Sequence, residues 1–262
     1  MTGATYSASE MMTVAAARAL RNDDICFVGI GLPSAACNLA RLTHAPQLTL
    51  VYESGTLETR PTVLPLSIGD GELCETALTT VSVPEMFQYW LQGGRISVGF
   101  LGGAQIDRFG NLNSTVIGPY GKPKVRLPGS GGATEIATAC RRIYIVMRHN
   151  PRAFVQTLAF VTSLGHGVTG RERRAMGITT EGPALVVTDL CTMTPDAETK
   201  EFEVVSLHPG VTREQVRENT GWDVRFASHV AETPAPGDHE LETLRDLNAR
   251  TARAHGTVAV SD

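Results

Sequence analysis

The sequence predicts an α/β fold, in which an open, mostly parallel sheet carries helices on both faces. Two observations support this prediction. Short, continuous apolar runs, such as residues 25–30, are typical of strands buried on both faces, and segments with helical spacing separate these runs. The chain has 262 residues, of which 42% are apolar and 19% are charged, so it is long enough for a sizeable core and ordinary in composition.

The first part of the chain predicts a helix followed by one βαβ unit. Ser7 and Glu10 match a capping box, and Pro33 suits the start of the second helix. The elements expected are a helix over residues 11–20, a strand over 25–30, a helix over 35–42 and a strand over 48–52. Glu53 directly follows the second strand, so a carboxylate stands at the carboxyl end of that strand.

The alternation continues through the rest of the chain. The further elements expected are helices over residues 85–91, 133–139, 212–219 and 241–254, and strands over 96–101, 143–147, 184–189 and 202–207. The strand over 202–207 alternates less regularly and is expected at a sheet edge. A Pro/Gly linker over 233–238 precedes the last helix, about residues 239–255. We find no domain boundary and expect a single domain over residues 1–262.

Charge and composition exclude several functions. The net charge of −4 gives no basis for binding nucleic acid or an anionic membrane. No apolar run approaches the roughly 18 residues of a membrane span, and the N-terminus lacks a signal-peptide pattern. The five cysteines lack CxxC spacing, and four of them lie in or beside apolar segments, namely Cys26, Cys37, Cys140 and Cys191, which indicates buried thiols in a reducing cytoplasm. The seven histidines show no ligand spacing, so no metal site is expected.

Glu53 and three small-residue turns are the candidate catalytic features. The turns contain Ser54 and Gly55, then Gly102, Gly103 and Gln105, and then Gly131, Gly132 and Ala133. Ligands of open α/β sheets bind at the carboxyl ends of strands. A carboxylate that faces turns with accessible backbone suits covalent catalysis on a thioester, because the tetrahedral oxyanion needs backbone N–H donors.

Two other interpretations of Glu53 stay open at this point. Gly29 and Gly31 follow a strand, and an acid ends the next strand, which imitates a dinucleotide fingerprint; its third glycine position, however, holds Ser34, beside Pro33. Alternatively, Glu53 only satisfies turn amides. Further along the chain, we expect His166 to be an exposed loop residue and a basic cluster to be a solvated charge run, with substrate contact as the alternative; the cluster is Arg171, Arg173 and Arg174.

Four motifs in combination resemble the β-subunits of class I CoA-transferases, in particular the glutaconate CoA-transferase branch. They span residues 53–55, 102–107, 110–115 and 129–133. Longer stretches resemble the members that act on 3-oxoadipate in catechol and chlorocatechol degradation; these are residues 26–34, 62–73, 89–100 and 206–222. The resemblance covers roughly residues 8–256.

The resemblance implies a NagB/ribose-5-phosphate-isomerase-like fold and an α-subunit partner, in a heterodimer or heterotetramer. It implies transfer of CoA from succinyl-CoA to 3-oxoadipate through a glutamyl-CoA thioester on Glu53, with CoA as substrate and no other cofactor. By family position, Gly131 and Gly132 are oxyanion candidates, and the remaining pocket candidates are Gly31, Ser54, Gly55, Gly102, Gly103, Gln105 and Ala133. The alternatives are another short acid, such as glutaconate, or a CoA-ester hydrolase or decarboxylase; the acid kept at Glu53 favours the transferase.

Overall fold

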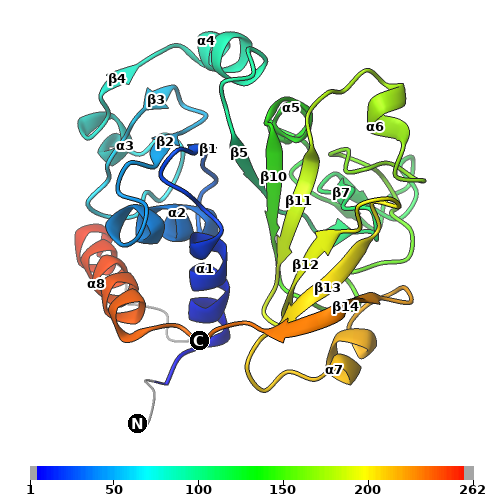
Figure 1. The fold of residues 1–262 in the computed structure, drawn as a ribbon. Coiled ribbons are helices and arrows are strands. Elements are labelled where there is room, and N and C mark those ends of the chain that lie inside the picture. The colour runs from blue at the N-terminus through cyan, green and yellow to red at the C-terminus, as the bar shows by residue number, and fades with distance from the viewer. Residues whose placement is uncertain (1–4, 257–262) are drawn as a thin grey trace. The chain divides into compact units, whose positions relative to one another are not determined.

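The computed structural model describes residues 5–256, which fold as two compact units (Figure 1). Unit 1 comprises Met1–Phe100 and Ala235–Asp262, of which residues 5–100 and 235–256 are described, and unit 2 comprises Leu101–Pro234. Whether both units belong to one family domain stays a prediction.

Unit 1 contains a sheet with the strand order β5-β1-β2-β3-β4. Its strands are β1 (Ile25–Phe27), β2 (Thr49–Val51), β3 (Thr56–Leu57), β4 (Thr79–Thr80) and β5 (Val98–Leu101, which ends at the first residue of unit 2). β1 pairs in parallel with both β2 and β5, whereas β3 and β4 are added in antiparallel fashion. The helices are α1 (Ala8–Arg18), α2 (Leu32–Leu42), α3 (Gly71–Glu75), α4 (Val83–Glu85), the π-helix η1 (Met86–Leu91) and α8 (Asp238–His255).

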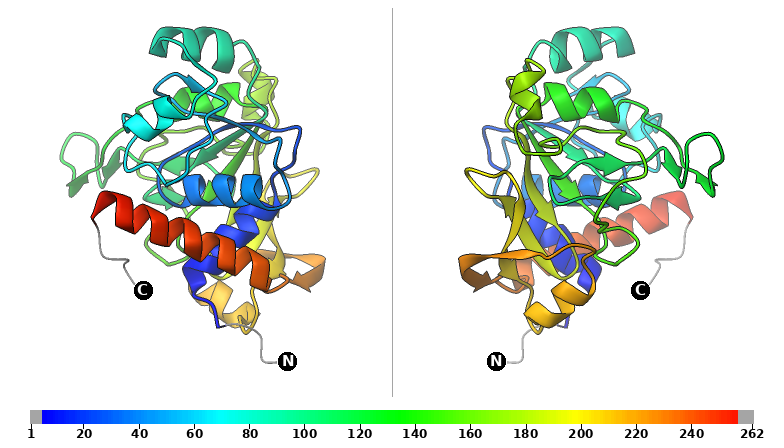
Figure 2. Two further views of the ribbon diagram at one scale, coloured as in Figure 1. Left: turned by 90° about the vertical axis from the view of Figure 1, so that its left-hand side faces the viewer. Right: turned by 90° about the vertical axis from the view of Figure 1, so that its right-hand side faces the viewer.

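Local sequence explains where the helices of unit 1 begin and what they bury. The capping box predicted at α1 is confirmed, because the Ser7 hydroxyl accepts from Glu10 N at 3.2 Å and Ser7 N donates to the Glu10 carboxylate at 2.8 Å. α8 buries Leu241, Leu244 and Leu247, which share one helical face. With that face, α8 packs beside α1 and α2, as both views of Figure 2 show. The predicted C-terminal helix is thus confirmed.

Unit 2 contains a sheet with the strand order β10-β11-β12-β13-β14. Its strands are β10 (Arg142–Val146), β11 (Gly182–Val187), β12 (Cys191–Pro195), β13 (Phe202–Leu207) and β14 (Arg225–Glu232). The pairs β10–β11 and β13–β14 are parallel, and β12 is antiparallel to both of its neighbours. Two small hairpins are formed by β6 (Gln105–Ile106) with β7 (Leu112–Asn113) and by β8 (Val116–Ile117) with β9 (Val125–Arg126); the helices are α5 (Ala133–Ala139), α6 (Glu172–Ala175) and α7 (Arg213–Glu218).

The predicted α/β class is confirmed, but one expectation about the strands was wrong. The strand over 202–207 is not at an edge, because β13 lies between β12 and β14, and its irregular alternation reflects a register shift between Val204 and Ser206. The helix expected over 85–91 is a short α-helical turn followed by a π-helix. The four cysteines in apolar surroundings are buried as thiols, namely Cys26, Cys37, Cys140 and Cys191, whereas Cys74 is exposed.

No helix in residues 5–256 is both long enough and apolar enough to cross a bilayer. Over the same range, no three His, Cys, Asp or Glu side chains gather in a way that could hold a metal ion.

Candidate active site

Glu53 lies in a tight turn at the carboxyl end of β2. Gly55 N donates to Tyr52 O at 2.9 Å, and Tyr52 N donates to Thr56 O at 3.1 Å, so the turn closes the β2–β3 hairpin. Glu53 and Ser54 occupy the two central positions of this turn. The backbone of Glu53 is therefore fixed by the sheet on both sides.

Only glycine fits at the end of this turn. Gly55 has a φ of +102°, which L side chains rarely adopt, and a Cβ there would overlap the carbonyl oxygen of Val81. Val81 N also donates to Gly55 O at 2.9 Å. The segment that follows β4 thus lies directly against the Glu53 turn and holds it in place.

The Glu53 carboxylate is half-buried and makes no hydrogen bond or ion pair with the residues that the structure describes. The hydroxyls of Ser54 and Thr56 are buried nearby in the chain, and they too find no partner among residues 5–256. Polar groups in such surroundings normally have partners, because leaving them unpaired is unfavourable. The interpretation that Glu53 satisfies turn amides is therefore not supported, and its carboxylate is free to meet a ligand.

The loop before α2 lies at the same sheet edge as Glu53. β1 and β2 run in parallel with Phe27 opposite Val51, so their carboxyl ends coincide. Gly31 caps α2 with a φ of +82°, and the Ser34 hydroxyl is 2.9 Å from the Tyr52 hydroxyl. The loop that holds Gly31 and the turn that holds Glu53 thus both follow the carboxyl ends of neighbouring strands. Ser34 is fully buried at the place where the dinucleotide fingerprint needs a glycine, which argues against that alternative.

In unit 2, Gly102 and Gly103 follow β5 and lead into the β6–β7 hairpin. A Cβ on Gly102 would lie 3.3 Å from Val146 O, at the carboxyl end of β10, and one on Gly103 would lie 3.3 Å from Asn113 O. The Asn113 amide donates to the Gln105 side-chain oxygen at 2.9 Å and so orients Gln105. These three candidates therefore occupy one closely packed turn.

The second glycine turn of unit 2 offers free backbone donors. Gly131 has a φ of +48°, and Gly132 precedes α5 as its N-cap. Ala133 N donates to Ser130 O at 2.8 Å, whereas the amides of Gly131 and Gly132 donate to no residue that the structure describes. Two adjacent free N–H groups are what an oxyanion requires. The meeting of these turns with Glu53 in one pocket stays a prediction.

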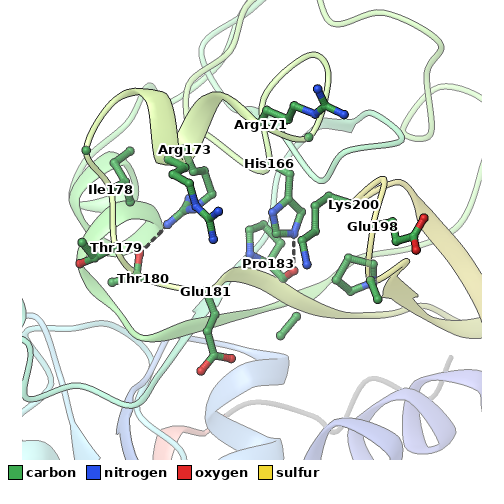
Figure 3. Close-up of a pocket in the computed structure, with 16 residues that line it drawn as sticks. His166, Arg171, Arg173, Ile178, Thr179, Thr180, Glu181, Pro183, Glu198 and Lys200 are labelled. Atoms are coloured by element: carbon green, nitrogen blue, oxygen red, sulfur yellow. Dashed lines mark hydrogen bonds between the residues drawn. The ribbon is translucent and has the colours of Figure 1, made fainter.

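The expectations for His166 and Arg173 were wrong. His166 is 4% exposed, and its Nε2 lies 2.8 Å from Pro183 O, so it donates; burial lowers the pKa of His166 to about 4. Arg173 is buried, and its guanidinium donates to the carbonyls of Ala137, Leu164 and Gly165. Both residues line a pocket in unit 2 (Figure 3). Gly165 is the sequence feature that could have indicated this burial. A Cβ at this position would overlap the backbone of residues 109–111, because the 163–167 loop packs against that segment.

The chain belongs to the coenzyme A transferase family, whose sequence profile, described as "Coenzyme A transferase", matches residues 9–219. It is 63% identical to the β-subunit of 3-oxoadipate CoA-transferase from Pseudomonas knackmussii, over 96% of both chains. It is 37% identical to the β-subunit of glutaconate CoA-transferase from Acidaminococcus fermentans, over 92% of both chains. The crystal structure of the glutaconate enzyme from that organism superposes with a TM-score of 0.87 at 34% identity, over 92% of this chain and 94% of the other.

These similarities confirm the predicted family, the β-subunit type and the enzymatic class. They also confirm the fold class, since an experimental structure of the family has the same architecture. That both relatives are named as one subunit of an enzyme implies a partner subunit.

Proposed function

We propose that this chain is the β-subunit of an enzyme that moves CoA from succinyl-CoA to 3-oxoadipate, with Glu53 as the covalent nucleophile. The observation that carries this proposal is the Glu53 carboxylate itself, half-buried and unpaired on a turn that only glycine can complete. The name of the relative from Pseudomonas knackmussii supports 3-oxoadipate as the acceptor. The reaction belongs to aromatic degradation through catechol and takes place in the cytoplasm.

The reaction needs two acyl exchanges on one carboxylate. Glu53 attacks the thioester carbonyl of succinyl-CoA and expels the CoA thiolate, which leaves a mixed anhydride. The thiolate then attacks the Glu53 carbonyl, so that succinate leaves and a glutamyl-CoA thioester remains. The 3-oxoadipate carboxylate runs the same two steps in reverse. CoA is a substrate, and no other cofactor takes part.

A carboxylate is a weak nucleophile in water, and the surroundings of Glu53 favour its attack on a thioester. No cation or donor among the described residues stabilises its ground state, and partial burial makes the carboxylate more reactive than it is in water. The rigid turn limits the positions that it can take, which favours attack geometry. The free amides of Gly131 and Gly132 are the candidate donors for the oxyanion.

A covalent label tests this mechanism directly. Incubation with succinyl-CoA and no acceptor should load CoA onto the chain, and borohydride should then reduce the thioester to an alcohol. Peptide mass spectrometry should find the change in the peptide that contains Glu53, and Glu53→Gln should carry no label at first. A label on another residue would overturn the assignment.

The partner in this proposal is the α-subunit of the same family. Exposed large apolar side chains gather between residues 66 and 89 of unit 1; they are Leu66, Ile68, Leu78, Val83 and Tyr89. Such exposure is typical of a surface that another protein covers. The chain alone should be nearly inactive and should elute with a co-expressed α-like subunit in size-exclusion chromatography. A fully active monomer would contradict this.

Glutaconate is the second candidate acceptor, because the relative from Acidaminococcus fermentans, a glutaconate CoA-transferase, matches 92% of the chain. A hydrolase or decarboxylase of the same fold is the remaining alternative. Comparing kcat/KM for 3-oxoadipate, glutaconate and acetoacetate decides the acceptor. CoA release without an acceptor would instead indicate hydrolysis.

A further inference from the structure

A pocket of about 970 Å³ lies within unit 2, between the 166–181 segment, the start of β11 and the β12–β13 hairpin (Figure 3). His166 and the basic cluster line it, whereas Glu53 and the candidates in the three glycine turns do not. Its charged lining consists of the cations Arg171, Arg173, Arg174 and Lys200 and the acids Glu181 and Glu198. The pocket is therefore positively charged overall.

Three of these cations have no anionic partner. Arg171, Arg174 and Lys200 form no ion pair with any residue that the structure describes, whereas Glu181 is already paired with Arg141 at 2.9 Å. Positively charged side chains that face the same pocket repel one another, and an anion bound between them would reduce that repulsion.

Arg173 adds a positive charge whose position is fixed by hydrogen bonds. Its guanidinium is held by three backbone carbonyls and by the Thr180 hydroxyl at 2.6 Å. Burial lowers the pKa of Arg173 to about 10, so it stays charged at neutral pH. These acceptors are neutral, and the charge at the back of the pocket therefore remains uncompensated.

Lys200 reaches the pocket from a strained backbone. Its φ of +62° is in the left-handed region, which glycine adopts without strain and lysine does not. In Figure 3 its side chain extends toward His166. His166 donates through Nε2 to Pro183, so its Nδ1 carries a lone pair and can accept a hydrogen bond. The turn of the β12–β13 hairpin requires this conformation, because Lys200 N donates to Asp196 O at 3.1 Å and Asp196 N donates to Glu201 O at 2.9 Å.

We propose that this pocket is a second binding site, which takes a small organic dianion with phosphate or paired carboxylate groups. Arg171, Arg174 and Lys200 meet its charge in front of the fixed Arg173, and His166 Nδ1 accepts a hydrogen bond from a ligand hydroxyl or amino group. The proposal does not rest on the transferase assignment, because it concerns equilibrium binding.

Calorimetric titration of the full chain tests the proposal with three probes: inorganic phosphate, adenosine 3′,5′-bisphosphate and succinate. Lys200→Gly is the decisive variant, because it removes the charge and at the same time relieves the strained backbone. We expect it to raise the melting temperature while it weakens binding about tenfold, as loss of one charged contact does. Arg171→Gln should weaken binding similarly, and Lys122→Gln, an exposed cation outside the pocket, should change nothing.

The pattern of probes identifies the source of the dianion. Binding of the bisphosphate and phosphate that depends on Lys200 supports a phosphorylated ligand, and binding of succinate with the same dependence supports a dicarboxylate. If no probe binds, or if all bind equally well to Lys200→Gly and to the unaltered chain, the proposal is wrong.

Discussion

Two charged side chains in this protein, Glu53 in unit 1 and Arg173 in unit 2, differ in their hydrogen bonding. The Arg173 guanidinium is buried and donates to three carbonyls and a hydroxyl. The Glu53 carboxylate is half-buried and has no partner among residues 5–256. The first arrangement fastens chain segments together, and the second leaves a charge available for chemistry.

Replacing Glu53 should give the largest effect, and it should fall on activity alone. Glu53→Ala removes the nucleophile but no interaction, so we expect transfer to fall by about 10⁴-fold or more while the free energy of unfolding changes by less than about 0.5 kcal/mol. Glu53→Asp should lose about 100-fold, because its reach is one methylene shorter. Assays of transfer beside denaturant unfolding check both. A large loss of stability in Glu53→Ala would break the contrast with Arg173.

Replacing Arg173 should do the reverse and act first on stability. Arg173→Met leaves buried carbonyls without donors, which should reduce the free energy of unfolding by about 3 kcal/mol. The neighbouring Arg174 is exposed and unpaired within the described chain, so Arg174→Met is the matched control and should change stability by less than about 0.5 kcal/mol. Equal effects of the two substitutions would show that the carbonyl contacts do not stabilise unit 2.

Acid should lower the free energy of unfolding, because two buried histidines of unit 2 gain protons when the chain unfolds. Desolvation lowers the pKa of both His149 and His166 to about 4, so both are neutral in the folded protein and gain protons on unfolding. Their contribution to stability is complete above about pH 6.5 and is lost as the pH falls toward 4. We expect about 2 kcal/mol to be lost between pH 7 and pH 5.5 for the two together.

Urea unfolding at each pH measures this loss. His149→Gln removes one titrating group, so its stability should depend less steeply on pH than that of the unaltered chain. An identical slope would mean that His149 does not gain its proton on unfolding.

The smallest expected effects on stability concern two serines of unit 1. Ser34→Ala removes the hydroxyl that lies 2.9 Å from the buried Tyr52 hydroxyl and should cost about 1 kcal/mol of stability. Ser54→Ala removes a buried hydroxyl that has no partner in the described chain, so stability should stay unchanged or rise slightly. Thermal unfolding of the two variants side by side decides it. A larger loss for Ser54 would mean that its hydroxyl is satisfied after all.

Local sequence was enough to predict the features that depend on neighbouring residues. The capping box at Ser7, the helix Ala133–Ala139 and the acid at the end of β2 are all encoded within a few positions. β12 was missed although its side chains alternate, because it is short and ends at Pro195, and β14 was missed because it is largely exposed at the sheet edge.

The features that sequence analysis misjudged depend on contacts between distant segments. The acceptors of Arg173 come from residues 137, 164, 165 and 180, and no spacing rule joins them. The loop that buries His166 is held by Asn111, whose oxygen accepts from Gly165 N at 2.8 Å. Asn111 and Gly165 are more than 50 residues apart in the chain, so no local pattern predicts this contact.

The contact between Gly55 and Val81 makes the position of the nucleophile sensitive to events elsewhere on the surface. Val81 is joined to Gly55, and Gly55 to Tyr52, by successive backbone hydrogen bonds, so a displacement of the Val81 segment is transmitted to the turn that carries Glu53. Close on either side of Val81 stand the exposed side chains of Leu78 and Val83. A protein that docks on these two residues would therefore act on the reactive carboxylate mechanically, without touching it.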